Sequence, residues 1–348
     1  MKRLILMTAA LTLVAALSVP FASAQTTQPA DQAASQQDPE QAKAEFEAYS
    51  AWYAAYKAND FAKTIELGEP FVQKFPNSKY TKFIRDFIPR ARVQLFNQAQ
   101  QQGNINEMIR RGREIIAADP SKEIDIVTAL AVAIRQKELV ANPPNFSHAA
   151  EATEFTKRTA ELIEAGKIPT GADPKKFNET KGQTLGFLYQ TLAMIEDKNR
   201  NNQDKALEYY VKAAQFEPNN PAYYFECGRI HQLKYAAATD KYNAFPEEKR
   251  KVAPESMEPD VKAAFDLINT EADAVINCWA RFLGLAASSN SQAFPPAMRA
   301  EVTNALKELY KFRHPDEPDG YQKLIDQHRA NSTPPGASGT GNTASSNQ

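Results

Sequence analysis

The chain has 348 residues, with 41 Lys or Arg, 42 Asp or Glu and a formal net charge of −1. Because charges of both signs are scattered along it, the chain has no basic surface for nucleic acid or an anionic membrane, and we expect neither as a partner. Its length is at the upper limit of a single hydrophobic core but ordinary for a stacked repeat array.

Residues 1–24 have the pattern of a secretory signal peptide. Two basic residues precede an uncharged apolar run from Leu4 to Val19, and the segment closes on the small residues Ala22-Ser23-Ala24. The run is too short for a stable membrane span. No cysteine lies near the cleavage site, so a lipoprotein anchor is not expected. We therefore expect cleavage after Ala24 and a periplasmic or secreted protein that does not insert into a membrane.

Both ends of the remaining chain are predicted to be disordered. Residues 25–40 contain mainly Gln, Ala, Thr and Asp, and residues 330–348 are dominated by small and polar side chains. Such segments cannot bury enough apolar surface to offset the conformational entropy of the chain. The folded part is therefore expected to span residues 41–329.

A first helical pair is predicted from Gln41 to Phe75, with a turn at Asn59-Asp60. Its first helix carries an aromatic stripe at helical spacing, made of Phe46, Tyr49, Tyr53 and Tyr56. The intervening residues are also apolar, which gives the helix two apolar faces and is unusual for a lone amphipathic helix.

Further helices follow in order. A second pair is expected from Tyr80 to Pro120, with a first helix that is either unusually long or bent at Pro89. A strongly helical run covers Lys122 to Val140, and Ser147 is placed to cap the next helix. Leu185-Gly186 and Tyr189 then open the helix that leads to an Asn-rich turn at 199–202.

The most regular stretch runs from Gln203 to Leu233. Ala206, Tyr210, Ala213 and a closing Pro218 form one helix, and Pro221 begins the next at once. This stretch resembles a tetratricopeptide repeat junction, part of a helix–turn–helix unit of about 34 residues. The resemblance implies a right-handed α-solenoid of antiparallel helix pairs, here a degenerate array. The segment FVQKFPNSKY at 71–80 resembles the repeats of bacterial envelope proteins and, with the signal-peptide pattern, implies an exported bacterial protein.

The last third is less regular. A helix from Tyr224 to Tyr242, a proline-interrupted insertion from Phe245 to Pro259, and a long helix from Asp260 to Leu285 are expected. Two shorter helices follow, from Pro295 to Phe312 and from Gly320 to Arg329. The predicted fold class is therefore all-α.

Motifs for catalysis or metal binding were not found. The sequence has no His-Glu-x-x-His or Cys-x-x-Cys spacing, no Gly-x-Ser-x-Gly elbow and no phosphate-binding glycine loop. The histidines are interpreted as packing or surface residues, and no catalytic residue, cofactor or metal site is predicted; they are His148, His231, His314 and His328. The acidic cluster before Gly320 lacks the alternating ligands of a calcium loop and is interpreted as a turn.

The two cysteines, Cys227 and Cys278, stand on different predicted helices. In an oxidising compartment they could form a single disulfide, which requires Cα atoms within about 7 Å. The alternative is two separate buried thiols.

The resemblance implies that first helices line a concave face, so the aromatic stripe is the leading candidate for binding another protein or a peptide segment. Aromatic residues and arginine dominate binding energy at interfaces. Comparable positions later in the chain are Tyr223, Phe225 and Arg229. Alternatively, the stripe is core covered by the next repeat.

The expected function is a non-enzymatic interaction scaffold. The alternatives are a self-associating structural or spacer protein of the envelope, or an enzyme with its site in the insertion at 168–177 or 245–259.

Overall fold

The computed structural model describes residues 38–288 and 294–331. Within these residues every regular element is a helix and no strand occurs, so the predicted all-α class is confirmed. The predicted signal peptide and most of both predicted disordered ends lie outside the described residues. The first described helix begins at Pro39 and the last ends at Asn331, slightly beyond the expected limits of 41 and 329.

The chain divides into two compact units, and the division falls inside one helix between Asn178 and Glu179. We call the described residues 38–178 the N-terminal unit, and 179–288 with 294–331 the C-terminal unit. One repeat domain over residues 41–329 is predicted from the sequence, and the division at residue 178 was not predicted.

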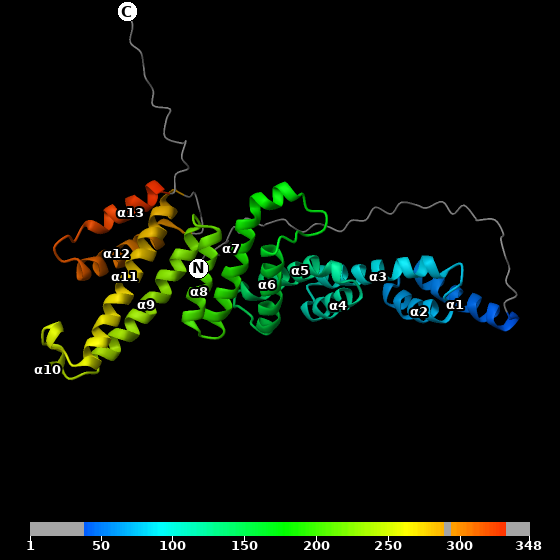
Figure 1. Ribbon diagram of the computed structural model, residues 1–348, viewed down its shortest axis with the longest axis horizontal. Helices are drawn as coiled ribbons and strands as arrows, with labels where there is room; N and C mark the ends of the chain where they lie inside the picture. The colour runs from blue at the N-terminus through cyan, green and yellow to red at the C-terminus, as the bar shows by residue number, and fades with distance from the viewer. Residues whose placement is uncertain (1–37, 289–293, 332–348) are drawn as a thin grey trace, which may run out of the picture. The chain divides into compact units, whose positions relative to one another are not determined.

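From α1 to α6, successive helices of the N-terminal unit pack against each other (Figure 1). They are α1 (Pro39–Lys57), α2 (Phe61–Lys74), α3 (Thr81–Gln102), α4 (Ile105–Ala118), α5 (Glu123–Ile134) and α6 (Ala149–Glu164), and the unit also contains the start of α7 (Pro174–Lys198). α3 continues through Pro89 as one helix of 22 residues, so the predicted long first helix is present. A short 3-10 turn (Pro120–Lys122) precedes α5, and a π-helical turn (Arg135–Leu139) follows it.

The C-terminal unit is organised around α9 and α11, which lie side by side (Figure 1). Its helices after α7 are α8 (Gln203–Phe216), α9 (Pro221–Asn243), α10 (Glu247–Arg250), α11 (Pro259–Ser288), α12 (Pro296–Arg313) and α13 (Gly320–Asn331). α12 and α13 also pack on α11, and one hydrophobic core contains Val275, Trp279, Phe282, Leu306 and Ile325, with Tyr224 and Phe225 of α9 packed against it. None of the described helices combines the length and apolarity needed to cross a membrane.

Three helices, α2, α4 and α8, are built to one plan. Each has 14 residues and starts after a side chain that accepts a hydrogen bond from the backbone N–H three residues on. These caps are Asp60, Asn104 and Asn202, and the closing prolines are Pro76, Pro120 and Pro218.

The same three positions of each of these helices are buried, the fourth, eighth and eleventh. They are Thr64, Gly68 and Phe71 in α2, Met108, Gly112 and Ile115 in α4, and Ala206, Tyr210 and Ala213 in α8. Equal length, capping and buried positions are what repeated helix pairs require, since each second helix must fit against its neighbours in the same way.

The predicted cap at Ser147 is wrong. α6 begins after His148, and no side chain caps its first turn. The imidazole of His148 instead bridges two other segments: Nδ1 lies 2.8 Å from Glu138 Oε1, and Nε2 lies 2.9 Å from Asn106 Oδ1. His148 therefore has a packing role, as predicted for it.

His328, on α13, makes the stability of the C-terminal unit sensitive to pH. Burial lowers its pKa below the ordinary value of 6.5, and the Arg281 guanidinium lowers it further. Since the folded chain binds this proton less tightly than the unfolded chain, stability is fully present above about pH 6.5 and is lost as the pH falls through the folded-state pKa. We therefore compare the free energy of unfolding at about pH 7 and about pH 5 by denaturant titration. Wild type should lose more of this free energy on acidification than His328→Asn. Equal losses in the two proteins would contradict this assignment.

Candidate functional site

The predicted aromatic stripe of α1 forms part of a larger surface. Tyr49 of the first helix pair stacks on Tyr80, which directly precedes α3 of the second pair, with ring centroids 3.6 Å apart. Tyr56 packs edge-on against Phe83 and Phe87 of α3, at 5.5 and 4.9 Å. We call this set the α1/α3 aromatic surface; it comprises Phe46, Tyr49, Tyr53, Tyr56, Tyr80, Phe83 and Phe87. It therefore joins the first helices of two successive pairs.

The surface is only partly covered by its own unit. Phe46, Tyr53 and Phe83 are 63%, 41% and 45% exposed, whereas Trp52 lies fully buried beneath them. Burial raises the pKa of Tyr49, and the neighbouring Tyr80, Tyr53 and Tyr56 add to the rise, so its hydroxyl stays protonated. The stripe is therefore divided: its inner side packs against the core, and its outer side faces solvent, where a partner could reach it.

Two lysines lie next to this surface. Lys57 Nζ is 5.9 Å from the centre of the Tyr53 ring, and Lys79 Nζ is 5.2 Å from the centre of the Tyr80 ring. Both ammonium groups contact rings. The exposed aromatic rings are therefore flanked by positive charge.

The three predicted positions on α9 do not form an equivalent surface. Tyr223 is 2% exposed and its hydroxyl donates to Glu217 at 2.6 Å, so it is an interior residue and cannot contact a partner in this conformation. Phe225 packs on Phe282, with ring centroids 5.2 Å apart. Arg229 is engaged by carboxylates, including Glu226 at 2.6 Å. The pattern that identified them is correct for a helix start, but Phe225 packs against α11, while Tyr223 and Arg229 are held by carboxylates.

A groove of about 530 Å³ lies among α4, α5 and α6. Its charged walls are joined by ion pairs: Arg158 donates twice to Glu123, at 2.7 and 2.9 Å, and Arg113 donates to Glu154 at 2.9 Å. These groups therefore stabilise the helix contacts.

The insertion at 245–259 likewise closes on itself, because Arg250 donates to the Phe245 carbonyl and accepts from Tyr242 through its own carbonyl. This arrangement is structural and gives no support to the enzyme alternative.

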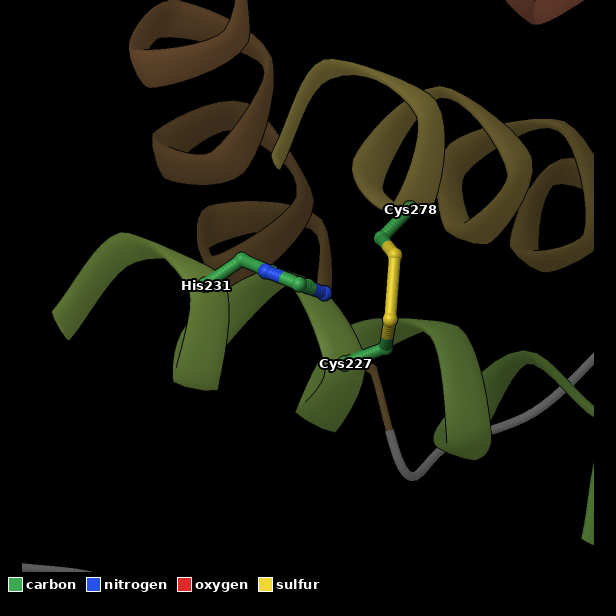
Figure 2. A group of neighbouring side chains, drawn as sticks. All are labelled: Cys227, His231 and Cys278. Atoms are coloured by element: carbon green, nitrogen blue, oxygen red, sulfur yellow. A yellow bond between two sulfur atoms is a disulfide. The ribbon is translucent and has the colours of Figure 1, made fainter. Parts of the chain in front are cut away.

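A second cluster lies between α9 and α11. Cys227 and Cys278 form a disulfide with Cα atoms 6.0 Å apart, and the ring of His231 points toward the two sulphur atoms (Figure 2). One ligand atom from each of these three residues lies within 4.8 Å of the others. On the other side of the ring, His231 Nδ1 lies 2.6 Å from Glu271 Oε2.

This cluster matches none of the metal-binding motifs expected from sequence. The Cys-x-x-Cys and His-Glu-x-x-His spacings are absent, and His231 was not predicted to lie beside the cysteines. A usable signal was present, since Cys227 and His231 are four residues apart and therefore share one face of a helix. Nothing in the sequence, however, indicates that Glu271 and Cys278 meet that face.

Comparison of the chain with protein-family models and with curated proteins gave no match.

Proposed function

We propose that this chain is an exported, non-enzymatic scaffold of the tetratricopeptide type that binds a segment of another protein in the bacterial cell envelope. The observation that carries the proposal is the α1/α3 aromatic surface, which leaves Phe46, Tyr53 and Phe83 exposed on adjoining first helices. Export rests on the signal-peptide pattern of residues 1–24.

The repeat architecture is supported by the common plan of α2, α4 and α8. Helices with the same length, cap and buried positions form similar pairs, and similar pairs stacked in series produce a solenoid. First helices of such pairs, here α1 and α3, are the ones that present side chains to a ligand. We infer that the solenoid is of the right-handed kind the resemblance implies.

The chemistry of the surface suggests what the partner segment carries. Exposed aromatic rings favour aliphatic or aromatic anchor residues, which gain most from burial. Lys57 and Lys79 at its edge favour a carboxylate beside those anchors. The partner is therefore expected to be an apolar segment flanked by acidic residues.

Site-specific photo-crosslinking tests the proposal. A photoreactive phenylalanine analogue replaces Phe46 in the full chain, and the control carries it at Phe312, which is 52% exposed on α12. We expect one envelope protein to cross-link from position 46 and not from position 312. Adding Lys57→Glu should reduce the yield of that product, because it reverses a charge beside Tyr53.

Two outcomes of the cross-linking experiment would contradict the scaffold proposal. The same products from both positions would mean that the aromatic surface has no selectivity. A cross-linked dimer of this chain alone would favour the self-associating structural protein over the scaffold.

A further inference from the structure

The Cys227, Cys278 and His231 side chains form a ligand set for a metal ion. Cys227 and His231 lie one helical turn apart on α9, and Cys278 faces them from α11 (Figure 2). Two sulphurs and one imidazole nitrogen are preferred by zinc, which typically takes four ligands in a tetrahedron. Their separation, within 4.8 Å of one another, allows one ion to contact all three after small side-chain adjustments.

Glu271 fixes the histidine in the orientation that metal binding needs. Its Oε2 lies 2.6 Å from His231 Nδ1, so Nδ1 donates the hydrogen bond and Nε2 keeps a free lone pair on the side of the sulphurs. Histidines that bind metals almost always donate their other ring nitrogen to such a partner. Glu271 is 4% exposed, and Lys234 Nζ lies 3.3 Å from its other oxygen. The carboxylate is therefore held in place.

The surrounding packing holds the ligands close without help from the sulphur–sulphur bond. Gly228, beside Cys227, allows the Trp279 ring to lie directly on the α9 backbone. On α11, the side chains of Ala272, Val275 and Ile276 near Cys278 are also buried. Because the helices are held together by this core, reduction of the disulfide leaves the two thiols facing each other.

We propose that Cys227, His231 and Cys278 bind one Zn²⁺ when the cysteines are reduced, and that the disulfide is the metal-free form of the same site. Charge balance favours this ion. Two thiolates neutralise Zn²⁺, and the buried Glu271 carboxylate lies beside Lys234, whose ammonium group also pairs with the exposed Asp204 at 2.8 Å. A monovalent ion would leave one negative charge unbalanced.

The interconversion is a two-electron exchange. A dithiol reductant passes two electrons and two protons to the Cys227–Cys278 bond, giving two thiols and the disulfide of the reductant. Zn²⁺ then displaces both thiol protons and binds the thiolates with His231 Nε2, leaving one coordination position for water. A disulfide oxidant takes the electron pair back and releases the ion. All three side chains are partly exposed, so the ion and the reductant can reach the site.

The test uses the full chain, reduced and oxidised, titrated with Zn²⁺ against a coloured chelator, and with Co²⁺ as a spectroscopic probe. We expect one ion per reduced chain, a sulphur-to-cobalt charge-transfer band, and no binding to the oxidised chain. Cys278→Ser should abolish the band. Glu271→Gln should weaken zinc binding by about 10–100-fold, because it loosens the histidine. His328→Asn, outside the cluster, should bind as wild type.

A second measurement needs no variant. Zn²⁺ should protect both cysteines of the reduced wild-type chain from alkylation, with protection read by mass spectrometry. The proposal is overturned if zinc leaves the alkylation rate unchanged, or if the oxidised chain binds zinc as tightly as the reduced one.

Discussion

Replacing Trp52 with alanine is expected to lower the free energy of unfolding of the N-terminal unit by about 3–5 kcal/mol, the range for deleting a buried large aromatic side chain. Trp52 is fully buried, and its indole contacts Tyr56 and Phe83 with ring centroids 5.4 Å away in each case. Its Nε1 also donates to the Thr64 carbonyl at 2.9 Å. The substitution removes this contact and leaves a cavity between α1, α2 and α3.

The measurement exploits the fact that the chain has two tryptophans, one in each unit. In Trp52→Ala, fluorescence reports the C-terminal unit through Trp279 alone, while circular dichroism reports both units. We expect an earlier denaturant transition by circular dichroism and an unchanged fluorescence transition. Phe46→Ala, on the exposed side of the same helix, should change stability by no more than about 0.5 kcal/mol. A loss below about 1 kcal/mol for Trp52→Ala would contradict the assigned core role.

Gly228→Ala is expected to destabilise the C-terminal unit by about 1–3 kcal/mol, the usual range for overpacking. A Cβ at this position would lie 2.2 Å from Trp279 Cδ1, far inside van der Waals contact. The Trp279 ring is 5% exposed and belongs to the core of α11, so it cannot swing away. α9 and α11 must therefore move apart locally, against the restraint of the Cys227–Cys278 disulfide.

Hydrogen exchange followed by mass spectrometry can localise this effect. Amides of α9 and α11 should exchange faster in Gly228→Ala, whereas those of α1 to α4 should keep their wild-type rates. Gln232→Ala, at an exposed position of the same helix, serves as the matched control and should exchange as wild type. Unchanged protection in α9 and α11 would show that the helices are not in the close contact described.

Local chemistry made most helix boundaries predictable. Caps such as Asp60 and Asn104 and closing prolines such as Pro76 act on their own turn of backbone, so a reader of the sequence can place α2 and α4 closely. The start of α7 differs from the prediction: the Leu185-Gly186 pattern predicts an opening there, whereas the helix begins at Pro174. The cap at Ser147 failed because His148 is drawn into a tertiary contact with Glu138.

The all-α class, the order of the helices and the aromatic stripe of α1 could be predicted from the sequence, since they follow from side-chain spacing along one helix. The packing of the helices establishes which aromatic residues remain exposed, why Tyr223 is interior, and that Cys227, His231, Glu271 and Cys278 meet between α9 and α11. These outcomes depend on which helix faces pack together. That choice is made by contacts between distant residues, such as Gly228 with Trp279, which no local pattern encodes.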